Sequence, residues 1–182
     1  MSAVRILLLP GWQNSGPGHW QTLWEQHQGF ERVQQDDWLW PRRGDWMIRL
    51  EEALLADDRP TVLAAHSLGC HLVAAWASHS QHTRRVVGAL LVAPPDLERA
   101  DTPPQVQTWA PTHRQPLPFA STAVLSSDDP FCGTGTGLQM AAAWGSQIVT
   151  LAAAGHINAD SALGDWPAGH ALVQELMNPM AG

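Results

Sequence analysis

Short apolar runs alternate with helical patterns along almost the whole chain. Runs such as 4–9 and 86–93 are apolar at nearly every position, which is typical of strands buried on both faces of a parallel sheet. The stretches between them carry apolar residues at helical spacing or are rich in alanine. The predicted strands are Val4–Leu9, Arg32–Gln35, Thr61–Ala65, Val86–Ala93, Ala120–Ser126 and Gln147–Leu151, and the predicted helices are His19–Gln28, Asp45–Ala56, Leu68–Ser80, Gly135–Trp144 and Ala168–Met177.

This alternation predicts an α/β fold with three layers, in which helices cover both faces of a parallel sheet. The chain from 1 to 182 shows no internal repeat, low-complexity tract or domain boundary, so we expect one domain. A proline-rich connection, Pro94–Pro118, is too long for a turn and is the candidate for a lid. Ligands of such folds bind at the carboxyl ends of the strands, and we expect the functional site there.

Composition narrows the classes of partner. The 182 residues carry a net charge of −7, which argues against nucleic acid and against an anionic membrane. Two cysteines, Cys70 and Cys132, are too few for a disulfide framework or a thiolate metal site. The apolar stretch near the N-terminus ends at Pro10, too early for a signal peptide or a membrane span, so we expect a cytoplasmic protein.

A candidate nucleophile follows the third predicted strand. The stretch Ala65-His66-Ser67-Leu68-Gly69 differs by one residue from Gly-x-Ser-x-Gly, the turn that presents a reactive serine between a strand and a helix. Flanking side chains must be small because strand and helix approach closely, and Ala65 adds one methyl group to that contact. Taken alone, the motif leaves open whether Ser67 is a nucleophile or a helix cap.

A serine nucleophile needs a base, and the base needs a carboxylate that orients it. In this class of sheet the order along the chain is serine, acid, histidine. Asp128 or Asp129 follows the fifth predicted strand and His156 follows the sixth, and the residues themselves leave the choice of aspartate open. We expect the side chain of His66 to diverge from Ser67, and we interpret His71, His79, His82 and His170 as surface or core residues.

Two backbone amides must face the oxyanion that forms during acyl transfer. We expect that of Leu68, at the start of its helix, and that of Trp12, in the loop after the first strand. Neither a His-Glu-x-x-His pattern nor a glycine-rich phosphate loop occurs, so no metal and no cofactor are expected. Ten tryptophans suggest an indole-rich pocket for an apolar group, with walls expected at Trp12, Asn14, His19, Trp38, Trp40, Trp109, Phe131 and Trp166.

Four blocks carry a resemblance to a known family: LPGWQNSGPGHWQTLWE, AHSLGCHLVAAW, SSDDPFC and GHINADSALGDWPAGHAL. Over nearly its whole length the chain resembles the small serine hydrolases of the α/β-hydrolase superfamily that group with retinoblastoma-binding protein 9 and the YdeN-like proteins. The resemblance implies six parallel strands in the order 2-1-3-4-5-6 and a catalytic triad of Ser67, Asp129 and His156. Ala65 departs from the glycine that many relatives have at this position.

The same resemblance implies hydrolysis of small carboxylic esters through an acyl-enzyme, with the natural substrate unassigned. The alternative hypothesis is a non-catalytic protein-binding member of the fold whose triad is inert. The Leu-x-Cys-x-Glu pattern that would bind retinoblastoma protein is absent, and no other pattern identifies a protein partner. A cysteine nucleophile is disfavoured, because Cys70 should lie inside a helix and Cys132 has no evident base.

Overall fold

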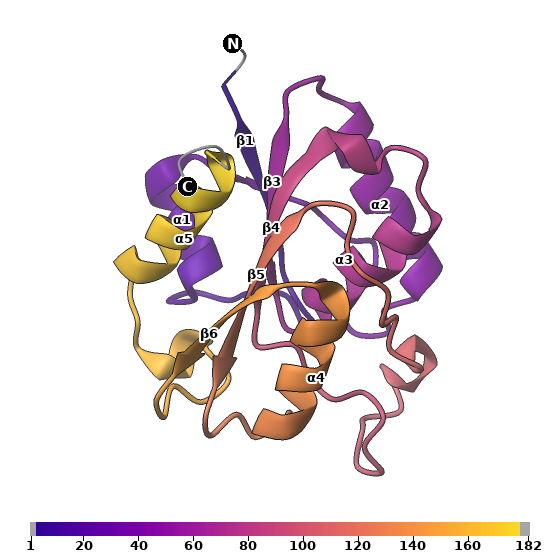
Figure 1. Ribbon diagram of the computed structural model, residues 1–182, viewed down its shortest axis with the longest axis vertical. Coiled ribbons are helices and arrows are strands. Elements are labelled where there is room, and N and C mark those ends of the chain that lie inside the picture. Colours follow the sequence, from indigo (N-terminus) through magenta and orange to yellow (C-terminus); the bar gives the residue numbers. More distant parts are fainter. Residues whose placement is uncertain (1–2, 179–182) are drawn as a thin grey trace.

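The computed structural model describes residues 3–178 and contains a six-stranded sheet (Figure 1). Its strands are β1 (Arg5–Leu9), β2 (Glu31–Arg32), β3 (Thr61–His66), β4 (Val86–Val92), β5 (Ala120–Ser126) and β6 (Gln147–Leu151). They lie in the order β2-β1-β3-β4-β5-β6, and every neighbouring pair is parallel. The predicted fold class and strand order are confirmed.

Helices cover both faces of the sheet. They are α1 (Trp20–Gln28), α2 (Arg43–Leu55), α3 (Leu68–His79), α4 (Thr134–Trp144) and α5 (Pro167–Met177). Figure 1 shows α1 and α5 on one side of the sheet and α2, α3 and α4 on the other. Each begins and ends within two residues of its predicted range.

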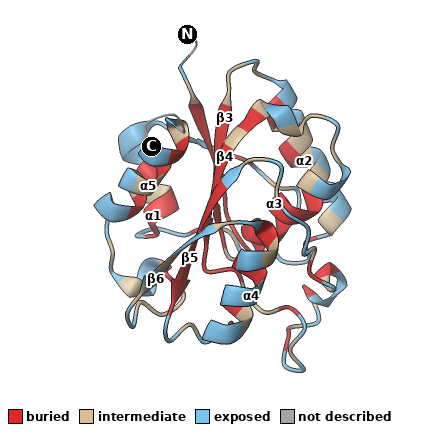
Figure 2. Ribbon diagram, viewed as in Figure 1, coloured by how far each residue is buried: buried red, intermediate tan, exposed pale blue. Residues whose placement is uncertain are grey.

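Successive residues of a strand point to opposite faces of the sheet and pack into two separate cores. This explains why the central strands are apolar throughout. Leu7 and Leu9 pack with α2, α3 and α4, whereas Ile6 and Leu8 pack with α1 and α5. Figure 2 shows the result as central strands buried along their length beneath helices whose outer sides are exposed. The two cores hold the sheet rigid, and with it the loops at the carboxyl ends of the strands.

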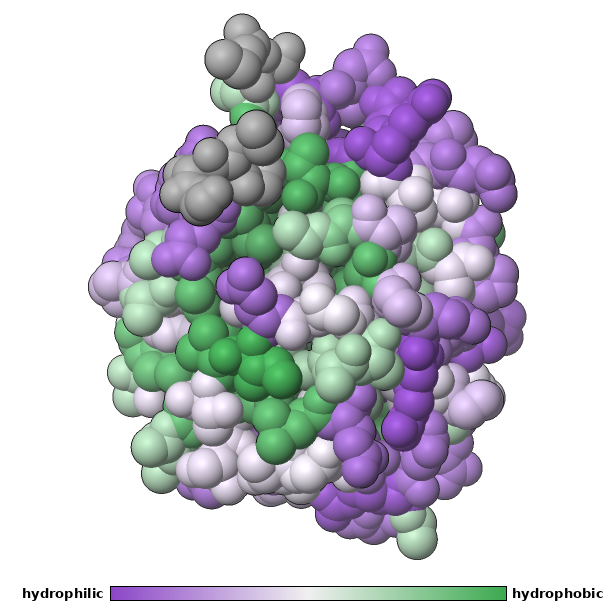
Figure 3. Space-filling model, in the orientation of Figure 1, coloured by the Kyte–Doolittle hydropathy of each residue, from purple (hydrophilic) through white to green (hydrophobic). Residues whose placement is uncertain are grey.

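The two edges of the sheet are less regular than its centre. We predicted the second strand at Arg32–Gln35, but β2 pairs with β1 only through Glu31 and Arg32, followed by one bond from the Val33 amide to the Leu8 carbonyl. The prediction was wrong in length because Val33 is the single apolar residue of that segment, so the chain buries little by continuing. At the other edge, β6 is largely exposed, and Figure 3 shows an apolar area over this region.

No helix among residues 3–178 is both long and apolar enough to span a lipid bilayer.

Candidate active site

Ser67 occupies a tight turn between β3 and α3. Its backbone has φ of 56°, in the left-handed region that non-glycine residues rarely adopt. The Ser67 amide donates a hydrogen bond to the carbonyl of Val92 on β4 at 2.9 Å, which fixes the turn to the sheet. This geometry presents the hydroxyl at the carboxyl edge of the sheet, as a nucleophile requires.

The two small residues of the motif have different surroundings. A methyl group at Gly69 would lie 2.3 Å from the carbonyl oxygen of Leu9, so α3 can pass the end of β1 only because this position lacks a side chain. Ala65, by contrast, is fully buried in the core on the α2 and α3 side, where its methyl group is in ordinary apolar contact. The missing first glycine therefore leaves the turn undisturbed.

Ser67, His156 and Asp129 form one hydrogen-bonded chain, although they are far apart in the sequence. The Ser67 hydroxyl lies 2.9 Å from Nε2 of His156, and Nδ1 of His156 lies 3.0 Å from both carboxylate oxygens of Asp129. The carboxylate can only accept, so Nδ1 carries the proton and Nε2 is free to accept the proton of Ser67. The side chains of Asp129 and His156 are only 3% and 10% exposed, and Phe131 covers the imidazole edge-on.

The loop after β5 holds the loop after β6 through consecutive contacts. Ser127, Ser126 and Asp128 accept hydrogen bonds from the amides of Ala153, Ala154 and Gly155, respectively, at 2.8–3.0 Å. The bond from the Gly155 amide, together with one from the Ser126 hydroxyl, lowers the pKa of Asp128.

The two aspartates that the residues left unresolved therefore have separate surroundings. Asp129 contacts the His156 ring, whereas Asp128 contacts the backbone next to it.

The amides of Leu68 and Trp12 both lie beside Ser67 without a protein acceptor. Neither donates a hydrogen bond to any of the described residues. Leu68 is the first residue of α3, where the free amides and the helix dipole favour negative charge. Gly11 keeps the Trp12 loop close, since a methyl group there would lie 2.8 Å from Cβ of Ser67.

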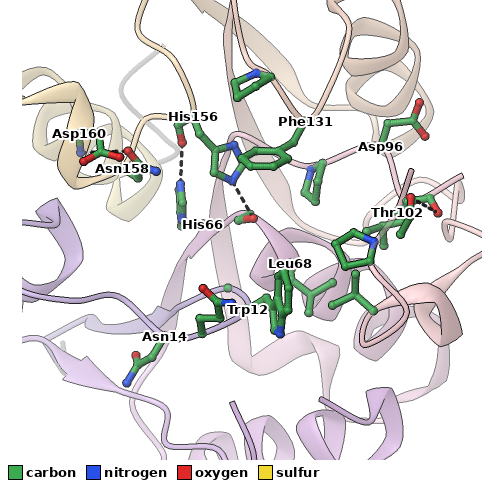
Figure 4. Close-up of a pocket in the computed structure, with 18 of the residues that line it drawn as sticks. Trp12, Asn14, His66, Leu68, Asp96, Thr102, Phe131, His156, Asn158 and Asp160 are labelled. Atoms are coloured by element: carbon green, nitrogen blue, oxygen red, sulfur yellow. Dashed lines mark hydrogen bonds between the residues drawn. The ribbon is translucent and has the colours of Figure 1, made fainter. Parts of the chain in front are cut away.

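Ser67 opens into a cavity of about 470 Å³, shown in Figure 4. Of the predicted wall residues, Trp12, Asn14, His19 and Phe131 line it. The rest of the wall mixes apolar side chains with the polar groups of Asn158 and Asp160.

The other four predicted wall residues lie elsewhere, and an indole-rich wall is a wrong prediction. Trp109 is 1% exposed and packs on Trp46 in the core, where Trp38 packs too. Trp166 is buried against Trp20 and Trp24, on the opposite side of the sheet, and Trp40 is 59% exposed. Loop position placed these indoles near the site, but burial of their large apolar surface places three of the four in the cores.

The Pro94–Pro118 connection supplies much of the wall facing Trp12. Leu97, Thr102, Pro103 and Val106 line the cavity from this segment, and the side chains of Leu97 and Val106 are otherwise buried. A short 3₁₀ helix, Gln107–Trp109, then anchors the segment, because the Trp109 indole donates to the carbonyl of Pro41 at 2.9 Å. Sequence reasoning had no means of placing this segment over the site.

His66 is the residue that sequence reasoning missed. Its side chain diverges from Ser67 as expected, but it is 5% exposed and contacts two other residues of the site. Nε2 of His66 lies 2.8 Å from the carbonyl oxygen of His156, and Nδ1 lies 3.3 Å from Nε2 of His19. The available signal was its place at the end of a central strand, directly before the candidate nucleophile.

The two thiols have poor properties for nucleophilic chemistry. Burial raises the pKa of the Cys70 thiol far above its usual value and that of Cys132 to about 11. Cys70 lies within the first turn of α3, as predicted. Among residues 3–178, no group of three or more histidine, cysteine, aspartate or glutamate side chains is arranged to hold a metal ion.

Comparisons with known proteins identify a family and structures of the same fold. The family model described as serine hydrolase matches residues 6–175. A YdeN-like hydrolase from Pectobacterium atrosepticum superposes with a TM-score of 0.85 at 26% identity, covering 97% of this chain and 92% of the other. The YdeN protein of Bacillus subtilis gives 0.71 at 20% identity, covering 98% and 100%, and the esterase RhEst1 of Rhodococcus gives 0.70 at 13%, covering 98% and 92%. A search of the curated proteins finds no match.

Proposed function

Since the chain belongs to the serine hydrolase family, whose model spans residues 6–175, we propose that it is a carboxylic-ester hydrolase that works through an acyl-enzyme at Ser67. The observation that carries this proposal is the hydrogen-bonded chain from Ser67 through His156 to Asp129 at the floor of a cavity. An inert triad in a purely binding protein would have no need of this alignment.

In the first step, the Ser67 oxygen attacks the ester carbonyl while Nε2 of His156 takes the hydroxyl proton. Asp129 holds the imidazole in the required tautomer and stabilises the imidazolium that forms. The backbone amides of Leu68 and Trp12 donate hydrogen bonds to the oxyanion, which is the negatively charged oxygen that the ester carbonyl becomes in the tetrahedral intermediate.

The intermediate collapses when His156 gives its proton to the departing alcohol oxygen, leaving an acyl group on Ser67. A water molecule then takes the place of the alcohol. His156 removes a proton from this water as the water oxygen attacks the acyl carbonyl. The second intermediate then collapses, the bond between the acyl carbon and the Ser67 oxygen breaks, and His156 returns the proton to Ser67 as the acid departs.

The proton transfer also orients the substrate, because the leaving oxygen must lie on the His156 side of the serine. Figure 4 shows Asn158 and Asp160 on that side, and Thr102 on the far side of Leu68. We therefore place the alcohol among polar groups and the acyl group against the apolar side chains of Leu97, Pro103 and Val106. The Pro94–Pro118 connection then acts as the wall of the acyl site.

A fluorophosphonate probe tests the nucleophile directly. The wild-type protein should be labelled at Ser67 and should hydrolyse a short p-nitrophenyl ester, and Ser67→Ala should abolish both. Ser78→Ala, on the same helix and outside the cavity lining, is the matched control and should behave as wild type. A folded wild-type protein that the probe leaves unlabelled would identify the alternative, a binding protein with an inert triad.

A further inference from the structure

Two buried histidines that the triad does not use lie beside it, and both contribute to the cavity lining. His19 is the N-cap of α1 and His66 ends β3, and their side chains are almost fully buried. Figure 4 shows His66 hydrogen-bonded to the main chain of His156. A buried polar pair of this kind needs a specific set of partners, because burial without them is costly.

The hydrogen bonds of this pair have a fixed direction. At one end the backbone N–H of Gln21, which can only donate, lies 3.1 Å from Nδ1 of His19. At the other end the His156 carbonyl, which can only accept, lies 2.8 Å from Nε2 of His66. One neutral arrangement satisfies every bond: each imidazole accepts at Nδ1 and donates from Nε2.

Burial keeps the pair neutral, as this arrangement requires. Desolvation lowers the pKa of His19 to about 3 and that of His66 well below its usual value. The charge of Arg32 adds to the effect at His19, and the neighbouring His19 adds to it at His66. A proton added to either Nδ1 would remove the acceptor on which the preceding donor depends. The two rings therefore keep one hydrogen-bond pattern through neutral pH.

The carbonyl that His66 contacts belongs to a strained peptide. Ile157, which shares that peptide with His156, is β-branched and fully buried yet has φ of 51°. The Trp20 indole donates to the Ile157 carbonyl at 2.9 Å, so the start of α1 holds the same segment directly, in addition to the contact from His66 at the end of β3. Strain of this kind persists only where surrounding groups impose it.

We propose that His66, oriented by His19, is a positioning residue that holds the main chain of His156 and so keeps its imidazole aligned between Ser67 and Asp129. This inference rests on the proposed function only for its kinetic consequence. The alignment itself is a property of the folded protein and has a readout of its own.

Two amide variants of His66 separate its hydrogen bond from its polarity. His66→Gln can place an N–H near the position of Nε2, whereas the shorter side chain of His66→Asn cannot reach the His156 carbonyl. Misplacing a catalytic group by about 1 Å costs roughly 10²-fold in rate, so kcat should fall by about that factor in His66→Asn with KM changed by less than about 3-fold. His66→Gln should recover most of the loss.

His19 is tested through a double-mutant cycle. His19→Leu should lower kcat in the same direction as His66→Asn, and the double variant should be less defective than the product of the two losses, because both act through one contact. His170→Asn is the matched control: its ring packs between Trp24 and Phe30, outside the cavity lining, and its loss should leave kcat unchanged.

Proton NMR gives a readout that does not require turnover. The Nδ1 proton of His156, held by Asp129, should give a downfield resonance in wild type and in His66→Gln that broadens or disappears in His66→Asn. That pattern in a protein without esterase activity would support the positioning role and refute the proposed function.

Two results would overturn the inference while leaving the esterase intact. One is a kcat and an NMR spectrum of His66→Asn that match wild type. The other is an equal loss in His66→Asn and His66→Gln, which would show that only the shape of the imidazole matters.

Discussion

The two positions that flank Ser67 in the motif are equivalent in sequence but not in space. Gly69 faces the backbone of β1 at a distance that excludes any side chain, whereas Ala65 faces an apolar core that accepts a methyl group. Glycine is thus required because α3 passes close to β1, and this contact lies at the second glycine of the pattern and not at the first.

A pair of reciprocal substitutions tests this distinction. Gly69→Ala should destabilise the protein by about 3 kcal/mol or more and lower turnover, because overpacking against backbone forces the turn to move. Ala65→Gly should cost about 1–2 kcal/mol through the lost methyl contact and the added chain entropy, with kcat changed by less than about 2-fold. Urea unfolding and initial rates measure both. A fall in kcat for Ala65→Gly comparable to that for Gly69→Ala would contradict the assignment.

The aspartates after β5 make a second matched pair. Asp129→Asn should lower kcat by roughly 10³–10⁴-fold, because an amide favours the wrong tautomer of His156. Asp128→Asn removes the charge from a carboxylate that holds only the Gly155 amide and the Ser126 hydroxyl, and we expect a loss of about 10-fold or less. Steady-state kinetics at pH 7.5 decides the matter, and equal losses would mean that Asp128 shares the role of Asp129.

Residue types and their order along the chain were enough to select Ser67 and His156, since a base after a late strand can reach only one edge of a parallel sheet. They were not enough to choose between the aspartates, which differ by a side-chain direction within one turn. They also failed for His66. Its importance comes from a contact with a backbone carbonyl 90 residues away, and that contact leaves no pattern in the sequence.

Among the larger elements, the central strands and the helices followed directly from hydrophobic periodicity because both faces of the sheet are buried. The Pro94–Pro118 connection did not, since its course depends on where Leu97, Val106 and Trp109 find apolar surface. These anchors turn an irregular segment into the wall of the cavity, so substrate preference should depend on them.

Shortening one wall residue should change the preference for acyl length. Val106→Ala enlarges the apolar end of the cavity, and the ratio of kcat/KM for p-nitrophenyl octanoate to that for the acetate should rise by about 10-fold. The substitution should also cost about 1–3 kcal/mol of stability as a cavity is created. Leu138→Ala, an exposed residue of α4, is the control. A ratio that stays constant would place the acyl group elsewhere.

Burial between the layers of the folded protein keeps several histidine side chains neutral. His19, His66 and His71 are buried, and desolvation lowers the pKa of each, to about 3 for His19 and about 4 for His71. In the unfolded chain they titrate near their usual value of 6.5. Between that value and pH 4, the unfolded state therefore binds protons that the folded state does not.

Unfolding free energy should therefore fall as the pH decreases from about 6.5 to 4.5. Each neutral buried histidine contributes a slope approaching about 1.4 kcal/mol per pH unit, and no such slope is expected above pH 7. His71→Gln keeps a donor for the Pro95 carbonyl but cannot titrate. The slope of its unfolding free energy against pH should therefore be smaller than that of wild type by the contribution of about one histidine. Urea titrations at half-unit pH steps measure this, and a flat profile from pH 6.5 to 4.5 would contradict it.

The central claim is that Ser67 carries an acyl group during turnover. Acid-quenched reactions with p-nitrophenyl butyrate, followed by intact and peptide mass spectrometry, test it most directly. We predict a butyryl adduct within the first turnover, located on the peptide that contains Ser67 and absent from Ser67→Ala, together with a burst of p-nitrophenol. Steady hydrolysis without an adduct, or an adduct that persists in Ser67→Ala, would contradict the account.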